Sequence, residues 1–314
     1  MTDVKLGAIL WSQATDWDGF LAAAQHSDEL GYDSIWTWDH LLAIFGEPDQ
    51  PIVEGYTALA ALAMATSSAE LGLLVGANTF RNPGLVAKSV ITIDHISGGR
   101  SVLGLGGAWF EPEHEAFGFD FGSGFGQRLD WLDEAVAAIR DLVDGGTFSS
   151  DETGRYRFDG LHLNPGPLRP KMPIMIGGSG ERKTLRTVAR YADQWHAFGS
   201  PDVLARKDLV LRRHCDEVGR NQGHIERSTG GKILIRHSED EANEVLRGIM
   251  ERNRTPMSAI DGDETFWVGT VGTIIDRMLA YREIGFDTFL IEMPSPYDRQ
   301  TMEALVEEVK PALA

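Results

Sequence analysis

A histidine follows a carboxylate at Asp39-His40, directly after a short run that contains Trp36 and Trp38. Histidine is the side chain that most readily gains or loses a proton near neutral pH, and an adjacent carboxylate can orient its ring. The alternative is a structural role, in which Asp39 caps a turn and His40 is a solvated loop residue. We favour proton transfer and take His40 as the candidate catalytic acid or base.

A glycine-rich segment with basic neighbours indicates an anion site. It comprises Gly177, Gly178, Ser179 and Gly180, and a predicted helix begins after it at Glu181. Glycines let a ligand approach the backbone closely, and a helix N-terminus offers free N–H groups to a phosphate. Three cations follow: Arg182, Lys183 and Arg186. A tight turn that needs a positive φ angle is the alternative explanation of these glycines.

Small residues are also dense in Gly104-Leu105-Gly106-Gly107-Ala108-Trp109, at the end of a predicted strand. Such a segment suits a flat ligand that lies against the backbone. Close packing of a strand against a helix inside the barrel explains the same residues equally well. Both interpretations stay open at this point.

The chain lacks the sequence motifs of two classes of hydrolase, the metal-dependent barrels and the serine hydrolases. The His-x-His that metal-dependent barrels commonly place after the first strand is replaced by Trp11-Ser12-Gln13. A nucleophile elbow, Gly-x-Ser-x-Gly, is also absent, because Gly178-Ser179-Gly180 does not have that spacing. The single cysteine, Cys215, allows neither an intramolecular disulfide nor a thiolate metal cage. We therefore expect no metal centre.

The net charge of the chain limits the classes of partner that it can bind. Its 314 residues include 29 Lys and Arg against 47 Asp and Glu, which gives a net charge of −18. Such a surface repels nucleic acids and anionic membranes, so a small-molecule substrate is expected. No run approaches the roughly 20 apolar residues of a membrane span. Met1–Leu6 shows no signal-peptide pattern, and we expect a cytoplasmic protein.

The scaffold for these residues follows from a regular alternation of short apolar runs and longer segments of helical period. The predicted strands are Lys5–Leu10, Ser34–Trp38, Leu71–Gly76, Ser101–Leu105, Pro173–Ile176, Gln194–Phe198, Gly231–Arg236 and Thr288–Glu292. A helical segment follows each of them, and Phe266–Val268 is too short to assign. This alternation predicts an α/β protein with a closed (β/α)₈ TIM barrel.

The predicted barrel is one domain, residues 1–314, with insertions after its fourth strand at Phe110–Gln127 and Ser149–Met172. An open doubly wound sheet is the alternative, but no Gly-x-Gly-x-x-Gly pattern follows the first strand. Barrels carry their chemistry at the C-terminal ends of the strands. The segments there are Trp11-Ser12-Gln13, Asp39-His40, Ala77-Asn78-Thr79, Gly106 to Trp109, Gly177 to Gly180 and His196-Ala197-Phe198. Of the other histidines, we expect His95 to be structural and His114 and His162 to be within reach of a substrate.

Several motifs together resemble the bacterial luciferase-like monooxygenase superfamily. They are Arg81-Asn82-Pro83, Thr92-Ile93-Asp94-His95-Ile96-Ser97-Gly98-Gly99-Arg100, Gly104 to Trp109, Glu113-His114-Glu115-Ala116-Phe117-Gly118 and Ile176 to Arg186. The resemblance covers nearly the whole chain. The segment Gly31 to Trp36, followed by Asp39-His40, is most similar to the subgroup labelled as oxidoreductases that depend on the deazaflavin coenzyme F420.

The resemblance implies a flavin or deazaflavin ring near the third strand, where the family often has a non-proline cis peptide. That peptide is expected around Gly76, Ala77 and Asn78. Gly107 and Ala108 would line the ring, Asp39 would contact its polar edge, and His40 would carry the proton. The phosphate would bind at Gly177, Gly178, Ser179, Gly180 and Glu181. The substrate would lie against Trp11, Trp38, Trp109 and Phe110.

One segment departs from the pattern. Dehydrogenases of this family carry Thr-Gly-Glu where this chain has Gly107-Ala108-Trp109, and their glutamate assists proton handling. That role is open here unless Glu111 or Glu113 fills it. The function expected from the resemblance is hydride transfer between coenzyme F420 and a small organic substrate.

The main alternative is a monooxygenase that uses FMN, dioxygen and a partner flavin reductase. A non-catalytic cofactor carrier is a further alternative. The resemblance also suggests a homodimer, in which the small-residue helix Thr57–Ala65 could pack against its copy, although an internal contact explains that helix equally well.

Overall fold

Several strands of this protein are buried on both faces. In the computed structural model, which describes residues 3–314, every residue of β5 (Ser101–Gly106) and of β13 (Thr288–Met293) is buried. Strands of this kind belong in a parallel sheet with helices outside it. The remaining strands of this sheet are β1 (Lys5–Leu10), β2 (Ser34–Thr37), β3 (Glu70–Leu73), β4 (Gly76–Ala77), β8 (Ile174–Gly177), β9 (Gln194–His196), β10 (Glu226–Thr229), β11 (Lys232–Ile235) and β12 (Phe266–Gly269).

The sheet closes on itself, because β1 pairs in parallel with both β2 and β13. The order around it is β1, β2, β3, β5, β8, β9, β10 and β13, and β4 continues the path of β3 beside β5. Thr229 of β10 pairs with Phe289 and Lys232 of β11 pairs with Glu292, so β10 and β11 follow β13 in one register as a single interrupted strand. The predicted TIM barrel is confirmed, and β12 is an addition on the outer side of β11.

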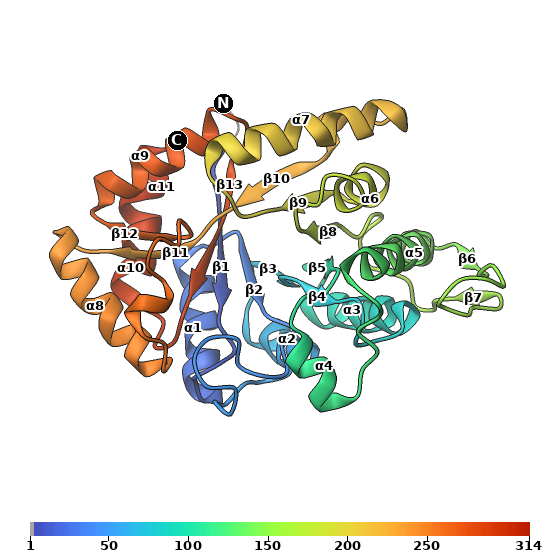
Figure 1. Ribbon diagram of the computed structural model, residues 1–314, viewed down its shortest axis with the longest axis horizontal. Coiled ribbons are helices and arrows are strands. Elements are labelled where there is room, and N and C mark those ends of the chain that lie inside the picture. Colours follow the sequence, from blue (N-terminus) through green and yellow to red (C-terminus); the bar gives the residue numbers. More distant parts are fainter. Residues whose placement is uncertain (1–2) are drawn as a thin grey trace.

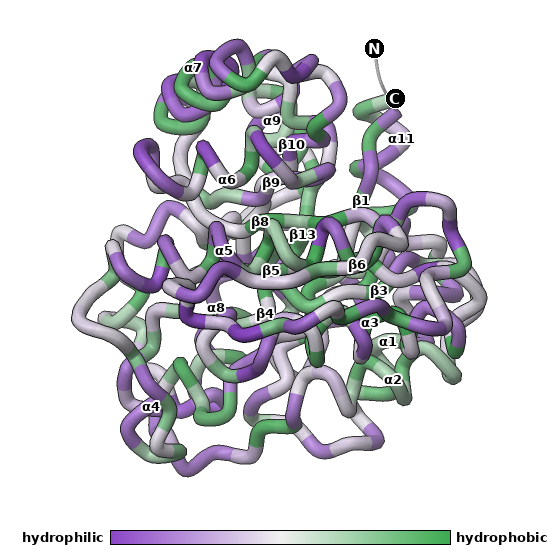
Figure 2. The backbone as a smooth tube through the Cα atoms, turned by 90° about the vertical axis from the view of Figure 1, so that its right-hand side faces the viewer, coloured by the Kyte–Doolittle hydropathy of each residue, from purple (hydrophilic) through white to green (hydrophobic). Residues whose placement is uncertain are grey.

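Ten further segments cover or extend the barrel as helices (Figure 1). They are α1 (Trp17–Leu30), α2 (Gly55–Ala65), α3 (Pro83–Ser97), α5 (Phe125–Val143), α6 (Thr184–Tyr191), α7 (Pro201–Glu217), α8 (Glu239–Arg252), α9 (Val271–Arg282), α10 (Arg299–Ala304) and α11 (Lys310–Ala312). Their ends follow local chemistry. Asp16 caps α1 through its carboxylate, and Gly31 ends that helix in the left-handed conformation, as the sequence predicts. Figure 2 shows the result: hydrophobic residues are concentrated along the central strands, and hydrophilic residues alternate along outer helices such as α7.

Alternate strand residues fill the inside of the barrel, since successive side chains of a strand point to opposite faces. Ile9, Trp36, Val102, Met175 and Leu290 form one buried cluster from five strands. This apolar plug closes the barrel from below. Residues two positions further along these strands, such as Trp38, Gly177 and Glu292, therefore face the space at the C-terminal end, where function is expected.

Both insertions contain regular structure. The first holds a helix, α4 (Glu111–Phe117), and the second contributes to a hairpin of β6 (Thr147–Phe148) and β7 (Leu161–His162) that projects from the side of the barrel in Figure 1. Neither element has enough periodic residues to be assigned from sequence. The sequence pattern also misses β10, because Arg227, Ser228 and Thr229 give a polar strand although all three side chains are buried.

The third strand differs from its prediction. It ends at Leu73, and the non-proline cis peptide lies between Leu74 and Val75 rather than around Gly76–Asn78. Within residues 3–314 no helix has the length and apolar character to cross a bilayer. Met1 and Thr2, the first residues of the segment without a signal pattern, lie outside the described residues.

Candidate functional site

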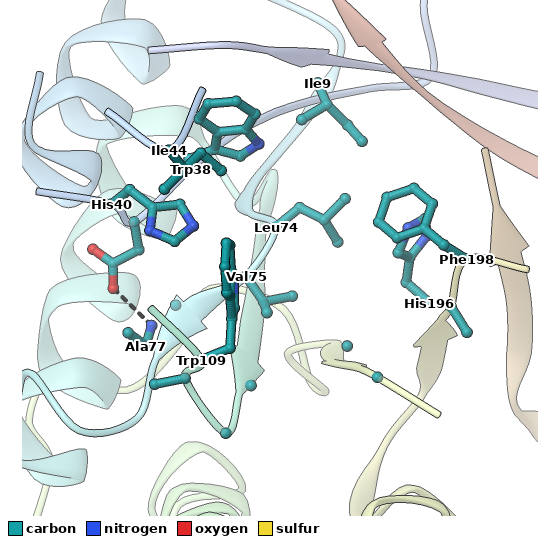
Figure 3. Close-up of a pocket in the computed structure, with 18 of the residues that line it drawn as sticks. Ile9, Trp38, His40, Ile44, Leu74, Val75, Ala77, Trp109, His196 and Phe198 are labelled. Atoms are coloured by element: carbon teal, nitrogen blue, oxygen red, sulfur yellow. Dashed lines mark hydrogen bonds between the residues drawn. The ribbon is translucent and has the colours of Figure 1, made fainter. Parts of the chain in front are cut away.

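A cavity of about 500 Å³ opens at the C-terminal ends of the barrel strands. Most of the side chains around it are apolar, and Figure 3 shows His40 and Trp38 on one side, His196 and Phe198 on the other, and Leu74 and Val75 between them. The predicted site residues that line this cavity are Trp38, Asp39, His40, Gly76, Ala77, Gly107, Ala108, Trp109, Gly177, Gly178 and Ser179. Those that do not line it are Trp11, Asn78, Phe110, Gly180 and Glu181.

His40 is held by a carboxylate from the first insertion. Its Nδ1 lies 3.0 Å from Oε1 of Glu113, and the other oxygen of Glu113 accepts the backbone N–H of Leu41 at 2.9 Å. Because an ionised carboxylate only accepts hydrogen bonds, Nδ1 carries the proton and Nε2 is left as the basic nitrogen. The rings of Trp38 and Trp109 meet the imidazole edge to face. This arrangement fits a proton donor or acceptor at the edge of the cavity.

Of the two glutamates that could replace the missing family glutamate, it is Glu113 that contacts His40. Glu113 is 2 % exposed, whereas Glu111 is exposed to solvent. The neighbouring His114 holds helix α4 in place: its Nδ1 donates to the carbonyl of Phe110, and its Nε2 accepts the hydroxyl of Thr79 at 2.6 Å. His114 is fully buried, so the expectation that it touches a substrate is wrong; it is a structural anchor for the helix that carries Glu113.

Asp39 does not orient His40. Its carboxylate accepts the backbone N–H of Ala77 at 2.8 Å, drawn as a dashed line in Figure 3, and the guanidinium of Arg81 at 2.8 Å. Burial raises the pKa of Asp39 to about 6, while Arg81 acts in the opposite direction. The Arg81 side chain also pairs with Glu54 and lies over the ring of Tyr56. Asp39 thus ties β4, the strip beneath the centre of the cavity, to the rest of the barrel.

The small residues at 104–109 serve both purposes that the sequence left open, but most of their close packing is between strands. Only Gly107 shows the expected packing against a helix: an added Cβ there would stand 2.8 Å from the Leu129 side chain of α5. An added Cβ on Gly104 would stand 1.9 Å from the carbonyl oxygen of Leu73, and one on Gly106 would stand 2.6 Å from Val75. These glycines let the end of β3 approach β5. Gly107 and Ala108, further along, line the cavity itself. The segment therefore packs against the strand at one end and faces the ligand space at the other.

The glycine loop after β8 likewise combines a turn with an open edge. Gly178 has a φ of +121°, and its N–H donates to the carbonyl of His196. The N–H groups of Ser179 and Gly180 make no hydrogen bond among the described residues, and Ser179 lines the cavity. Two of the four charged residues beside the loop are paired: Lys183 with Asp130 and Glu181 with Lys207. Arg182 and Arg186 are exposed and form no ion pair in the described part of the chain.

Residues 4–288 match the family model described as luciferase-like monooxygenase. The chain belongs to the luciferase-like monooxygenase family. Among curated relatives, it is similar to the pyrimidine monooxygenase RutA of Cronobacter turicensis, at 31% identity over 220 residues. That match covers 68% of this chain and 52% of the relative, so the chain spans about half the length of the curated relatives it matches.

Two solved structures show the same fold. An F420-dependent secondary alcohol dehydrogenase in complex with an F420-acetone adduct superposes with a TM-score of 0.84 at 20% identity, over 100% of both chains. The oxygenating constituent of 3,6-diketocamphane monooxygenase from Pseudomonas putida, in complex with FMN, has a TM-score of 0.76 at 16% identity, over 100% of this chain and 99% of that chain. At these identities the likeness is one of fold.

In this luciferase-like protein, some predicted site residues lie behind the residues that line the cavity. Trp11 is fully buried behind the cavity, where its ring stacks on Phe45 at 4.4 Å. Phe110 lies beside His40 and precedes helix α4, and the amide of Asn78 donates to the hydroxyl of Tyr156. These residues support the residues that line the cavity. His162, which the sequence placed within reach of a substrate, is exposed on the β6–β7 hairpin and contacts the carbonyl of Gly146.

Three polar side chains on the opposite half of the cavity escaped the sequence analysis as individual candidates: His196, Lys232 and Glu292. His196 lies within one of the strand-end segments, and Glu292 ends a predicted strand. Only the alternation along β13 could have identified Glu292, which stands two residues after the plug residue Leu290. Nδ1 of His196 lies 3.1 Å from the hydroxyl of Ser228, which itself donates to the carbonyl of Trp195. Nδ1 therefore carries the proton, and the imidazole is neutral.

Burial of His196 makes the stability of the protein sensitive to acid. Burial lowers the pKa of this imidazole to about 3 in the folded protein, from an ordinary value of 6.5. Between these values the unfolded chain binds a proton that the folded protein does not, so stability falls as the pH falls. From pH 7 to pH 5 this histidine should cost about 2 kcal/mol of unfolding free energy. Urea unfolding measures the stability of the wild type and of His196→Gln at both pH values. Between pH 7 and pH 5 the wild type should lose about 2 kcal/mol more stability than the variant. Equal losses in the two proteins would contradict this prediction.

Proposed function

We propose that this protein is a monooxygenase that uses reduced FMN and dioxygen to oxygenate a small organic substrate. The observation that carries the proposal is the 31% identity to a pyrimidine monooxygenase over 220 residues. The F420-dependent alcohol dehydrogenase is 20% identical, which supports a common fold and not a common cofactor. The proposal thus prefers FMN to the coenzyme F420 that the sequence motifs alone favoured.

The residues of the cavity fit FMN. A flat ring system requires apolar walls, and Trp38, Leu74 and Val75 supply them. A single phosphate requires a few N–H donors and little net charge, and the loop offers the N–H groups of Ser179 and Gly180 with Arg182 nearby. The tail of coenzyme F420 carries further negative charges. Within residues 3–314, the cations beside the loop that form no ion pair are Arg182 and Arg186, on a chain whose net charge is −18.

When bound, reduced FMN would supply two electrons to dioxygen, so that one oxygen atom enters the substrate and the other leaves as water. The chain itself has three tasks. The apolar walls exclude bulk water from the ring. His40, fixed by Glu113, accepts or returns a proton at Nε2. Asp39 and Arg81 keep β4 in place beneath the ring. Reduced FMN would come from a partner reductase.

A homodimer is also predicted, and a measurement of the molecular mass in solution would check it.

Hydride transfer with coenzyme F420 is the second candidate, and one specific observation favours it. The glutamate that the family's dehydrogenases place after Thr-Gly is absent at Trp109, but Glu113 brings a carboxylate to His40 from helix α4. A proton relay suited to a deazaflavin is therefore present in another form.

Titration of the purified protein with each cofactor separates the two candidates. We expect FMN to bind at micromolar concentration, with a shift of its visible absorption, and coenzyme F420 to bind at least about tenfold more weakly, which corresponds to about 1.4 kcal/mol. With photoreduced FMN and a pyrimidine such as uracil as the first substrate to be tried, ¹⁸O₂ should label the product. Tighter binding of coenzyme F420, together with reduction of a substrate in the absence of oxygen, would overturn the proposal in favour of the second candidate.

A further inference from the structure

An ion pair lies inside the cavity, on the side away from His40. Lys232 of β11 and Glu292 of β13 are paired in the parallel register, with Nζ 3.4 Å from Oε2. Both residues line the cavity, and both are less than 10% exposed. Charged side chains are rarely so buried, and a buried pair usually contributes little net stability. Its position therefore calls for a functional explanation.

The strand geometry places this pair one layer above the apolar plug. Glu292 follows Leu290 by two residues, so both side chains point to the inside of the barrel, and Leu290 belongs to the plug. Lys232 lies directly beside Glu292 on the neighbouring strand. Gly230 and Gly231, between β10 and β11, bring the backbone this close: an added Cβ on Gly230 would stand 1.8 Å from the carbonyl of Leu290.

The pair retains unused hydrogen-bonding capacity. Oε2 of Glu292 accepts the indole N–H of Trp11 at 3.1 Å, but Oε1 has no hydrogen-bond partner among residues 3–314. The ammonium of Lys232 has three N–H donors. One of them is used by the hydroxyl of Thr265, at 3.0 Å, and Glu292 lies on another side. The cavity thus presents an acceptor and a donor next to each other, on the half of the cavity that also holds His196.

We propose that Lys232 and Glu292 bind the polar end of the substrate, and that this end is a neutral amide-type group with a carbonyl next to an N–H. The carbonyl accepts from the Lys232 ammonium, and the N–H donates to Oε1 of Glu292. A carboxylate substrate would be repelled by Glu292 and a cationic one by Lys232, so the pair selects a neutral group. The apolar wall formed by Phe45, Leu74 and Phe198 accommodates the rest of a small ring. This inference rests on the proposed function, because it names the substrate class of that site.

The flavin ring also has a carbonyl next to an N–H at its polar edge, so this edge could bind the pair in place of a substrate. The experiment must therefore separate binding of the substrate from binding of the cofactor. The test uses the FMN-loaded full chain and two probes, 2-pyridone and N-methyl-2-pyridone, which differ only at the N–H. Calorimetric titration should show that the wild type binds 2-pyridone at least about tenfold more tightly. Binding needs no turnover, so the result does not depend on finding the true substrate.

The decisive variant replaces both members, Lys232→Met with Glu292→Gln. Removing one member alone would leave a buried charge unpaired and could unfold the protein, whereas replacing both is often neutral, and the Gln carbonyl still accepts from Trp11. We expect this double variant to bind both probes within about twofold of each other and to keep the wild-type affinity for FMN. The matched control is the same exchange at the ion pair Lys5–Glu226, which is more exposed and lies at the other end of the barrel: Lys5→Met with Glu226→Gln should keep the preference for 2-pyridone.

Three results would overturn the inference. They are equal binding of the two probes by the wild type, a preference that persists in the double variant, and a loss of FMN affinity of about tenfold in that variant, which would assign the pair to the cofactor. Failure of the wild type to bind FMN would instead count against the proposed function. The two probes would then be compared on the chain without FMN, where the same preference and its loss in the double variant are still expected.

Discussion

Replacing His40 with alanine is expected to lower kcat by about 10²–10³-fold, in the range that a positioned acid or base contributes. The reason is geometric: Glu113 fixes the Nδ1–H of His40 and leaves Nε2 as the nitrogen for proton transfer. The Kd for FMN should stay within about twofold, since the imidazole lies at the edge of the cavity and not at the glycine loop. Stopped-flow turnover and an absorbance titration measure the two quantities on the same preparation.

Glu113→Gln is the informative companion of this variant. An amide keeps the size of the carboxylate and still accepts the N–H of Leu41, but it cannot stabilise a protonated His40. Its kcat should fall less than that of His40→Ala, and the two substitutions together should cost little more than His40→Ala alone, because they act as one unit. His224→Ala, at an exposed histidine remote from the cavity, should keep full activity. Unchanged turnover in His40→Ala would remove this histidine from the mechanism.

The barrel could be predicted because its determinants are local. Apolar strand runs, the Asp16 cap and the Gly31 stop lie within a few residues of the elements they define, and each is confirmed. The polar strand β10 could not be predicted in this way. Its Arg227 is buried by ion pairing with Asp208, 19 residues earlier in the chain, so the pattern of a buried strand is absent from its own sequence.

The site was predictable as a set of strand ends but not as a set of contacts. The sequence placed His40 beside Asp39, and proximity along the chain suggested that they act together. In the structure the two side chains have different partners, since successive residues leave the chain in different directions: Asp39 meets Arg81, and His40 meets Glu113 across 73 positions. The pair Lys232–Glu292 is likewise formed only when β11 pairs with β13, 60 positions later in the chain. Long-range pairs of this kind leave no local signal.

Gly104→Ala is expected to destabilise the protein by about 2–4 kcal/mol and to weaken FMN binding by about tenfold or more. The added methyl group would stand 1.9 Å from the carbonyl oxygen and 3.1 Å from the carbonyl carbon of Leu73. Both are backbone atoms, so no side-chain rotation relieves the overlap, and the end of β3 must move away from β5. Leu74 and Val75, which line the centre of the cavity, directly follow Leu73 and would move with it.

The two effects can be separated by measurement. Urea unfolding gives the stability, and FMN titration well below the unfolding midpoint gives the affinity of the protein that is still folded. Gly248→Ala is the matched control: that glycine lies inside helix α8 with nothing within 4 Å of an added Cβ, so alanine should leave FMN binding unchanged and raise stability by up to about 1 kcal/mol. If Gly104→Ala lost stability but kept the wild-type affinity for FMN, the FMN ring would not lie against the backbone at Leu73–Val75. The cofactor would then have to be held mainly by the half of the cavity formed by β8 and its glycine loop.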